Sequence, residues 1–313
     1  MATLKSNKPG TFRYGTTWPQ GMNDLTIEIV AFRDGTEKWG GQKNDRPFHF
    51  KKIVNEFWGP KSRKHFVWNP WNERMLESAC NHQWAKWSGC AASGKTDMGA
   101  MWAIVNWLCA PAGTAVLVTS TSLDDSRRRI WGRIEEYFNA ACDEHGNPVL
   151  PGKLVSSTGK LRTVINGVVQ SDRCGIYLIA GDRSKEKENI GKIIGLHNVF
   201  VFFVTDEMPE LSPALTEAAK SNLVSNPHFQ MIDLGNFKSV YDAFGISCTP
   251  KDGWGSVNEE VDGWETKDGG YCLRFDGLKS PNILLGHEKY KGIYCQRDLD
   301  SQREQLGEHS AGF

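Results

Sequence analysis

The sequence has no excess of charge of either sign. Its 313 residues include 37 Lys and Arg against 37 Asp and Glu, so its formal net charge at pH 7 is zero. This balance excludes a protein whose whole surface is basic, and it restricts contact with nucleic acid to local patches. Three basic stretches are available, at residues 50–65, 127–133 and 183–192. Because a run of charge is more often a solvated face, both interpretations stay open.

Long apolar runs, paired cysteines and an apolar leader are also missing. The longest apolar run, residues 198–206, falls far short of the roughly 20 residues that a membrane helix needs. Residues 1–15 have no apolar core of the kind found in secretory signals. The eight cysteines include no CxxC pair and have no His cluster near them, which favours reduced structural thiols over zinc or disulfides. We therefore expect a cytosolic protein without a membrane segment.

Helical and strand patterns alternate along the middle of the chain. Apolar spacing predicts helices at 69–84, 95–110, 123–146 and 212–223, and strands at 84–89, 114–122, 175–181, 198–207 and 228–237, with hairpin material at 153–181. This alternation is typical of an α/β fold with crossover connections. Composition divides the chain into an N-terminal arm or cap (1–45), a core (46–250) and a small appended subdomain (251–313).

A glycine-rich turn matches the G-x-x-x-x-G-K-[ST] pattern in full. The pattern lets main-chain N–H groups face phosphate oxygens, places the lysine near the β- and γ-phosphates, and gives Mg²⁺ a hydroxyl ligand. A chance match would lack the strand and the apolar helix that flank this turn. The predicted nucleotide-binding residues are Gly89, Cys90, Ala91, Ala92, Ser93, Gly94, Lys95 and Thr96, and the predicted cofactors are ATP and Mg²⁺.

A second motif ends the apolar strand at 198–207. Asp206 can hold the metal through water, and Glu207 can orient and polarise the attacking water. The alternative is a buried strand whose two acidic residues cap the next element. Because parallel strands place their carboxyl ends on one edge, the two motifs together predict one ATPase site. Its catalytic residues are Glu207 and Lys95, and its metal ligands are Thr96 and Asp206.

These motifs predict a P-loop NTPase of the additional-strand, catalytic-glutamate type, with a mainly parallel sheet flanked by helices. A third strand ends in Gly235 and Asn236. The amide of Asn236 could sense the γ-phosphate, or the pair could be a plain turn, for which Gly-Asn is suitable. Gln83, before the first strand, either contacts adenine or is an ordinary surface side chain.

The order of these stretches resembles the ATPase domain of the large terminase subunit of tailed bacteriophages, a motor that packages double-stranded DNA into procapsids. The resemblance lies in "SGCAASGKTD", "VFFVTDE" and "IDLGNF", with a β-rich insert before the acidic strand, and it covers roughly residues 50–313. It implies Lys95 and Thr96 as phosphate-loop groups, with Asp206 as metal ligand, Glu207 as catalytic carboxylate and Asn236 in a coupling motif.

The resemblance further implies that ATP hydrolysis drives double-stranded viral DNA into a procapsid. The implied partners are DNA, a portal protein, a small terminase subunit and further copies of the chain in a ring. The implied place is the host cytoplasm, at the portal vertex. The rival hypotheses are a helicase-like or other nucleic-acid-remodelling P-loop ATPase, which would need a second motor domain, a switch with little turnover, and a metabolic kinase.

Two departures from the family qualify this expectation. Many terminases have a basic residue near the start of the loop, where this chain has Gly89 and Cys90. A charge-stabilising arginine must then come from elsewhere, and the candidates are Arg127, Arg128, Arg129, Arg162 and Arg183. The family's nuclease domain has no room after Phe313, so we expect an isolated motor domain without nuclease activity. The acidic residues after position 250 look solvated, namely Glu259, Glu260, Asp262, Asp268 and Asp276.

Overall fold

The computed structural model describes residues 28–29, 31–33, 46–170, 173–180, 198–212, 214, 217–221, 226–236 and 238–306. The predicted N-terminal arm, the basic stretch at 183–192 with Arg183, and the tail after residue 306 lie wholly or mostly outside the described residues. The chain divides into two compact units. One consists of Met1–Phe66, Gly99–Asp206 and Leu211–Met231, and the other of Val67–Met98, Glu207–Glu210 and Ile232–Phe313.

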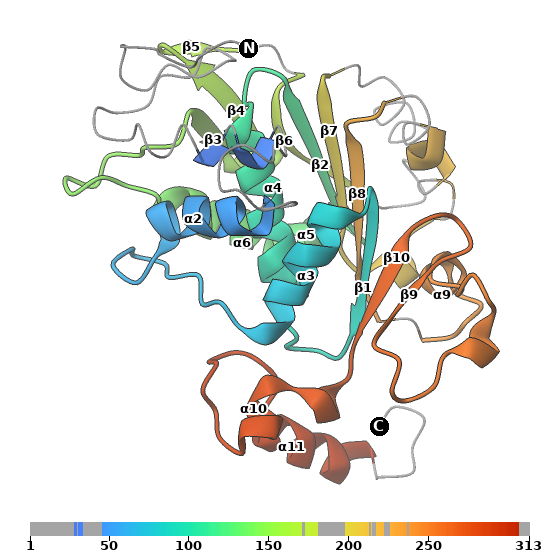
Figure 1. Ribbon diagram of the computed structural model, residues 1–313. Helices are drawn as coiled ribbons and strands as arrows, with labels where there is room; N and C mark the ends of the chain where they lie inside the picture. Colours follow the sequence, from blue (N-terminus) through green and yellow to red (C-terminus); the bar gives the residue numbers. More distant parts are fainter. Residues whose placement is uncertain are drawn as a thin grey trace. The chain divides into compact units, whose positions relative to one another are not determined.

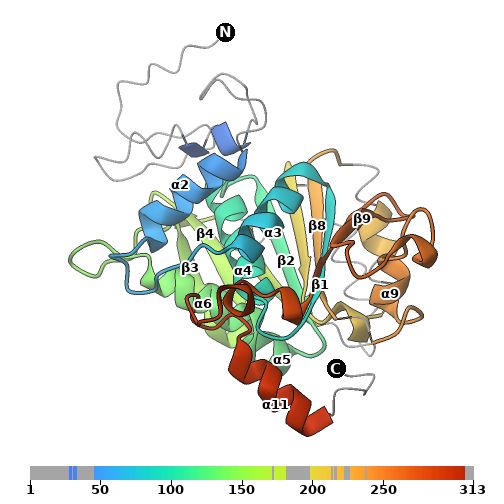
Figure 2. The same ribbon diagram turned by 60° about the horizontal axis from the view of Figure 1, so that its bottom comes forward.

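Figures 1 and 2 show the helices and strands of the described residues. The helices are α2 (Arg46–Trp58), α3 (Pro70–Asn81), α4 (Lys95–Cys109), α5 (Leu123–Arg128), α6 (Ile130–Ala140), α9 (Ala243–Ser247), α10 (Pro281–Leu285) and α11 (Gln296–Leu306). The strands are β1 (Trp84–Gly89), β2 (Thr114–Ser120), β3 (Gly152–Val155), β4 (Lys160–Ile165), β5 (Val168–Val169), β6 (Gly175–Ala180), β7 (Phe200–Thr205), β8 (Phe229–Gly235), β9 (Gly263–Glu265) and β10 (Tyr271–Phe275). Of the helix predicted at 212–223, residues 217–221 are described and helical.

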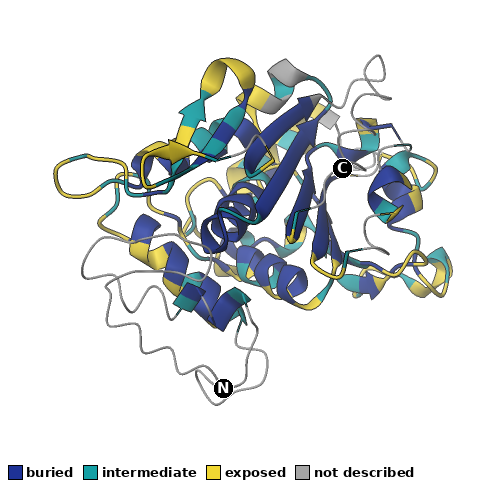
Figure 3. Cartoon of the chain, turned by 90° about the horizontal axis from the view of Figure 1, so that it is seen from above, coloured by how far each residue is buried: buried dark blue, intermediate teal, exposed yellow. Residues whose placement is uncertain are grey.

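The strands of the first unit follow the order β3-β4-β6-β2-β7, and β5 pairs with β4. β2 lies between β6 and β7 and runs parallel to both, whereas β4 runs antiparallel to β6 and to β3. All residues of β2 and β7 are buried, and the central strands are dark blue in Figure 3. A strand covered on both faces is a continuous apolar run, which is why these two strands can be predicted from the sequence.

The turn between β4 and β5 has the chemistry that its geometry requires. Asn166 and Gly167 have φ values of 51° and 77°, both in the left-handed region. A two-residue hairpin turn of type I′ needs positive φ at both positions, and Asn-Gly is the pair best suited to it. The hairpin predicted around this dipeptide is confirmed.

One predicted helix is wrong as a single element. Residues 123–146 predict one amphipathic helix, but the structure has α5 and α6 with Arg129 between them. Arg129 has φ −101° and ψ −106°, far from helical values. A Cβ at Gly132, three residues on, would lie 2.9 Å from the carbonyl oxygen of Arg127. The chain therefore changes direction at Arg129, and apolar spacing that continues on both sides cannot reveal such a break.

The second unit contains the strand that precedes the phosphate motif. Its strands follow the order β8-β1-β10-β9, with the first residues of β8 assigned to the other unit. β10 runs parallel to β1, with Gly89 opposite Phe275, and antiparallel to β9. α3 packs on this pair, where the Trp71 ring meets the Phe275 ring edge-on at 5.6 Å. The pairing of β10 with β1 was not predicted, because composition alone suggested separate short strands after residue 250.

β1 carries a fully buried lysine. Lys86 is 0% exposed, and its Nζ donates to the carbonyl oxygen of Ser247 at 2.6 Å and to the Thr266 hydroxyl at 2.9 Å. It also forms an ion pair with the Asp268 carboxylate at 2.5 Å. A buried charge is tolerated only when it is paired and hydrogen-bonded. Asp268 is exposed, as expected, but its carboxylate also neutralises Lys86, because the turn between β9 and β10 folds back over β1.

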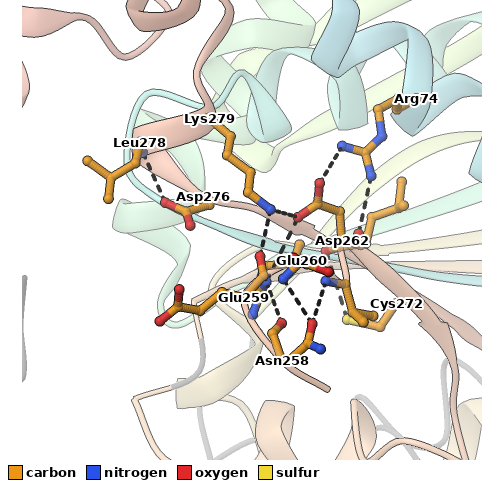
Figure 4. A network of polar contacts seen from close by, with 12 residues as sticks. Arg74, Asn258, Glu259, Glu260, Asp262, Cys272, Asp276, Leu278 and Lys279 are labelled. Atoms are coloured by element: carbon orange, nitrogen blue, oxygen red, sulfur yellow. Dashed lines mark hydrogen bonds and ion pairs between the residues drawn. The ribbon is translucent and has the colours of Figure 1, made fainter. Parts of the chain in front are cut away.

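A second polar network holds Asp262 (Figure 4). Its carboxylate accepts a hydrogen bond from Lys279 Nζ at 2.9 Å, and its carbonyl oxygen accepts one from Arg74 Nη2 at 3.2 Å. Asp276 Oδ1 accepts from the N–H of Leu278 at 2.9 Å. Asp262 and Asp276 are thus engaged in structure as well. Arg74 lies far from Asp262 in the sequence, and a partner this distant cannot be recognised from the composition of a glycine-rich turn.

Candidate active site

The phosphate-binding motif forms the turn between β1 and α4. Ala92 and Gly94 have φ values of 55° and 82°, so left-handed residues interrupt the loop. Such a backbone directs successive N–H groups to one side and forms a concave anion site. Within the described residues, no hydrogen bond is recorded for the main-chain N–H groups of residues 91–94. These four donors can therefore serve a bound phosphate.

The loop is held from outside by the C-terminal part of the same unit. The N–H of Cys90 donates to the carbonyl oxygen of Phe275 at 3.0 Å. The N–H of Tyr294 donates to the carbonyl oxygen of Ala92 at 2.9 Å. A Cβ at Gly89 would lie 2.5 Å from the Phe275 Cβ. Only glycine allows β10 to approach this closely. The first glycine of the motif is thus required by packing as well as by phosphate binding.

Lys95 is bound against the loop. Its Nζ donates to the carbonyl oxygens of Gly89 at 2.6 Å and Cys90 at 2.9 Å, and to Ser93 Oγ at 2.8 Å. Lys95 is the first residue of α4, and a helix N-terminus favours a bound anion. Burial raises the pKa of the Cys90 thiol to about 11, although Lys95 acts in the opposite direction. The thiol is therefore protonated at neutral pH and adds no negative charge beside the phosphates.

Asn236 contacts the loop directly. It follows β8, and its Oδ1 accepts a hydrogen bond from the N–H of Gly89 at 3.0 Å. The side chain of Asn236 therefore does more than form a turn, because it holds the end of β1 at the start of the loop. Its role in coupling hydrolysis to motion stays a prediction.

Asp206 and Glu207 follow β7, as the sequence predicts. Asp206 is 4% exposed, and its N–H donates to the carbonyl oxygen of Thr119 in β2 at 2.8 Å. Glu207 is half-buried and has φ 58°. A side chain in the left-handed region costs roughly 1–2 kcal/mol, and such strain is concentrated at functional sites. Asp206 belongs to the first unit, and Glu207 belongs to the second with Lys95 and Thr96.

The residues proposed for the metal have suitable chemistry. Mg²⁺ prefers oxygen ligands and usually combines one or two protein groups with waters and substrate phosphates. The hydroxyl of Thr96 and the carboxylate of Asp206 are such groups. Among the described residues, no cluster of three or more His, Cys, Asp or Glu could hold a metal. The role of Thr96 and Asp206 as metal ligands stays a prediction.

A cavity of about 580 Å³ lies beside the loop. Cys90, Ala91 and Ala92 line it from the loop, and residues of the segment 276–305 line it from the other side. Nothing in the sequence pointed to this segment, because it carries no motif. Gln83 is not one of the lining residues. It is exposed at the start of β1, and a strand of six residues places it about 20 Å from the loop, which favours the surface interpretation.

No family model matches the chain, and no curated protein matches it either. Among solved structures, the large terminase ATPase domain of Thermus phage P74-26 aligns with a TM-score of 0.52 at 12% identity, over 82% of this chain and 93% of that one. A mutant of that domain, with an arginine replaced by alanine, aligns with a TM-score of 0.53 at 12% identity, over 82% and 92%. This chain has the fold of a large terminase ATPase domain.

The terminase ATPase fold confirms the predicted class, an α/β P-loop NTPase with a mainly parallel sheet flanked by helices. The resemblance noted in the sequence is confirmed at the level of the fold. Among the described residues, no helix is both long and apolar enough to cross a membrane. All eight cysteines are free thiols in the structure.

Proposed function

We propose that this chain is the ATPase of a viral DNA-packaging motor, which hydrolyses ATP to drive double-stranded DNA into a procapsid. The observation that carries the proposal is the loop at residues 89–96. It combines four N–H groups that can bind phosphate with a lysine held against them, in a chain that has the terminase ATPase fold.

In this proposal the loop N–H groups and Lys95 bind the β- and γ-phosphates. Thr96 and Asp206 would hold Mg²⁺, which would supply positive charge to neutralise the phosphates. Glu207 accepts a hydrogen bond from a water molecule and polarises it for attack on the γ-phosphorus, giving ADP and phosphate. Asn236 fixes the entry to the loop through Gly89 and would transmit a change in the loop to β8.

The proposed partners are double-stranded DNA, a portal protein, a small terminase subunit and further copies of the chain in a ring. Two observations support this part of the proposal: the likeness to a phage terminase domain and the exposed Arg127, Arg128 and Arg129 at the end of α5. Arginines at an exposed turn can contact DNA phosphates or complete the active site of a neighbouring copy. The proposed place of action is the procapsid portal in the host cytoplasm.

Two substitutions test the assigned roles. Lys95→Ala should abolish ATP binding, measured by titration calorimetry, because the loop loses its only lysine. Glu207→Gln should bind ATP normally but hydrolyse it at least about 100-fold more slowly, because an amide can hold water without accepting its proton.

Lys267→Ala is the matched control, since Lys267 is exposed and lies on the turn before β10. It should bind and hydrolyse ATP like the wild type. Hydrolysis by Glu207→Gln at the wild-type rate would show that another group activates the water. ATP binding that survives Lys95→Ala unchanged would contradict the proposed site itself.

A further inference from the structure

The last residue of β2 carries a buried hydroxyl that has no hydrogen-bond partner. Ser120 is 0% exposed, and within the described part of the chain its Oγ forms no hydrogen bond. A buried polar group of this kind has lost its hydration without gaining a replacement, which costs free energy. In a folded protein such a group indicates a partner that the chain itself does not supply, namely a water molecule or a ligand.

The pairing of β2 with β7 places this hydroxyl beside Asp206. Thr119 pairs with Thr205, and the N–H of Asp206 donates to the carbonyl oxygen of Thr119 at 2.8 Å, which continues the parallel ladder by one residue. Because side chains alternate along a strand, Ser120 and Asp206 then lie on the same face of the sheet. Neighbouring strands are about 4.8 Å apart, a spacing at which one water molecule can bridge a hydroxyl and a carboxylate. Both residues belong to the first unit.

A hydroxyl in this place has the chemistry to support a metal ligand. Mg²⁺ usually keeps several of its waters, and those waters donate hydrogen bonds to groups around the site. Side chains that hydrogen-bond to the ligands of a metal orient them, and their loss typically lowers metal affinity by about 10–100-fold. A serine hydroxyl can accept one hydrogen bond and donate another at the same time. Ser120 can therefore connect the Asp206 carboxylate to the waters of the metal.

We propose that Ser120 is a positioning residue of the metal site, and that its hydroxyl hydrogen-bonds to the waters through which Asp206 would hold Mg²⁺. Ser120 acts through Asp206 and these waters, and it is not itself a metal ligand. The inference rests on the proposed function, because it takes Asp206 as a ligand of the metal that accompanies ATP.

The same strand provides a matched control. Thr114, the first residue of β2, is also 0% exposed, and its Oγ1 has no hydrogen-bond partner among the described residues. It lies an even number of residues from Ser120, so both hydroxyls share one face of the strand, about 20 Å apart. Ser120→Ala and Thr114→Val each remove one such hydroxyl. Without nucleotide and metal, both variants should be at least as stable as the wild type in urea denaturation, because an unsatisfied polar group has been removed.

The test measures the rise in melting temperature that a non-hydrolysable ATP analogue produces at increasing Mg²⁺ concentrations. Ser120→Ala should raise the half-saturating Mg²⁺ concentration at least about tenfold. Thr114→Val should leave it within about twofold of the wild-type value. The measurement needs no turnover, and a hydroxyl with a merely structural role would not change the Mg²⁺ dependence.

An unchanged half-saturating concentration in Ser120→Ala would overturn the inference, and so would an equal shift in Thr114→Val. A marked loss of stability of Ser120→Ala without ligands would also overturn it, because the hydroxyl would then have a partner within the protein. In each case the proposed function stands if Lys95→Ala still abolishes ATP binding. ATP binding that does not depend on Lys95 would instead contradict the proposed function.

Discussion

At the scale of single residues, Glu207 combines a chemical role with a costly backbone. Its φ of 58° lies in the left-handed region, which glycine adopts readily and a residue with a side chain adopts only at a cost in free energy. Glu207 is the second residue after β7, and its positive φ ends the extended backbone of the strand at that point. A residue retained at such a position is better explained by its chemistry than by its contribution to folding.

Glycine should therefore be more stable than alanine at position 207, by about 1 kcal/mol in the free energy of unfolding. Both substitutions remove the carboxylate, so the difference isolates the backbone. Urea denaturation of Glu207→Gly and Glu207→Ala measures it. At Glu210, which ends a short 3₁₀ helix, the order should be reversed. Equal stability of the two variants at position 207 would mean that the left-handed backbone costs nothing here.

At the scale of elements, β1 connects the core to the phosphate loop through a buried charge. Lys86 is three residues before Gly89, and its ammonium also lies 3.9 Å from the centre of the Trp84 ring. The Trp84 Nε1 in turn donates to Asp233 in β8 at 2.7 Å. These contacts tie β1 to the β9–β10 turn and to β8, so the start of the loop has a rigid support.

Asp268→Asn should destabilise the protein by about 2–3 kcal/mol in urea denaturation. It leaves the fully buried Lys86 ammonium without a counter-charge, although the hydrogen bonds to Ser247 and Thr266 remain. The control is Glu265→Gln, which breaks the Lys251–Glu265 pair on the same hairpin, where both side chains are about two-thirds exposed. That change should have a much smaller effect, because exposed pairs are screened by solvent. Similar losses in both variants would show that Lys86 does not depend on its carboxylate.

At the scale of the whole molecule, the balance of 37 basic and 37 acidic residues removes long-range attraction to DNA. Several basic side chains are also engaged with the protein's own groups. Lys64 and Arg133 both pair with Glu136, and Arg127 Nη2 donates to the carbonyl oxygen of Ser157. Tight binding to DNA would then need many copies of the chain, each contributing a few contacts.

We predict that the isolated chain binds duplex DNA weakly and without sequence preference, and that it does not cut it. Affinity should fall about tenfold or more between 50 and 200 mM salt, because phosphate contacts release counterions. Fluorescence anisotropy on two unrelated duplexes measures the first part, and incubation of supercoiled plasmid with Mg²⁺ or Mn²⁺ measures the second. Nicking that disappears when Asp262 or Asp276 is replaced, with Lys95 intact, would contradict the absence of nuclease activity.

The sequence by itself determined the elements that have a local cause. Buried strands such as β2 and β7 are continuous apolar runs, the Asn166–Gly167 turn has its own backbone requirement, and the loop at residues 89–96 has a fixed spacing of glycine, lysine and threonine. Each of these depends on neighbours within a few residues, and periodicity or motif spacing describes such neighbours well.

The features that depend on contacts between residues far apart in the sequence became visible only in the tertiary structure. The pairing of β10 with β1 explains why Gly89 must be glycine, and it brings the segment after Phe275 to the wall of the cavity. The burial of Lys86 and the hydrogen bond from the N–H of Gly89 to Asn236 belong to the same class. These contacts join residues that the chain separates by up to about two hundred positions, and loop closure over such distances leaves no periodic trace in the sequence.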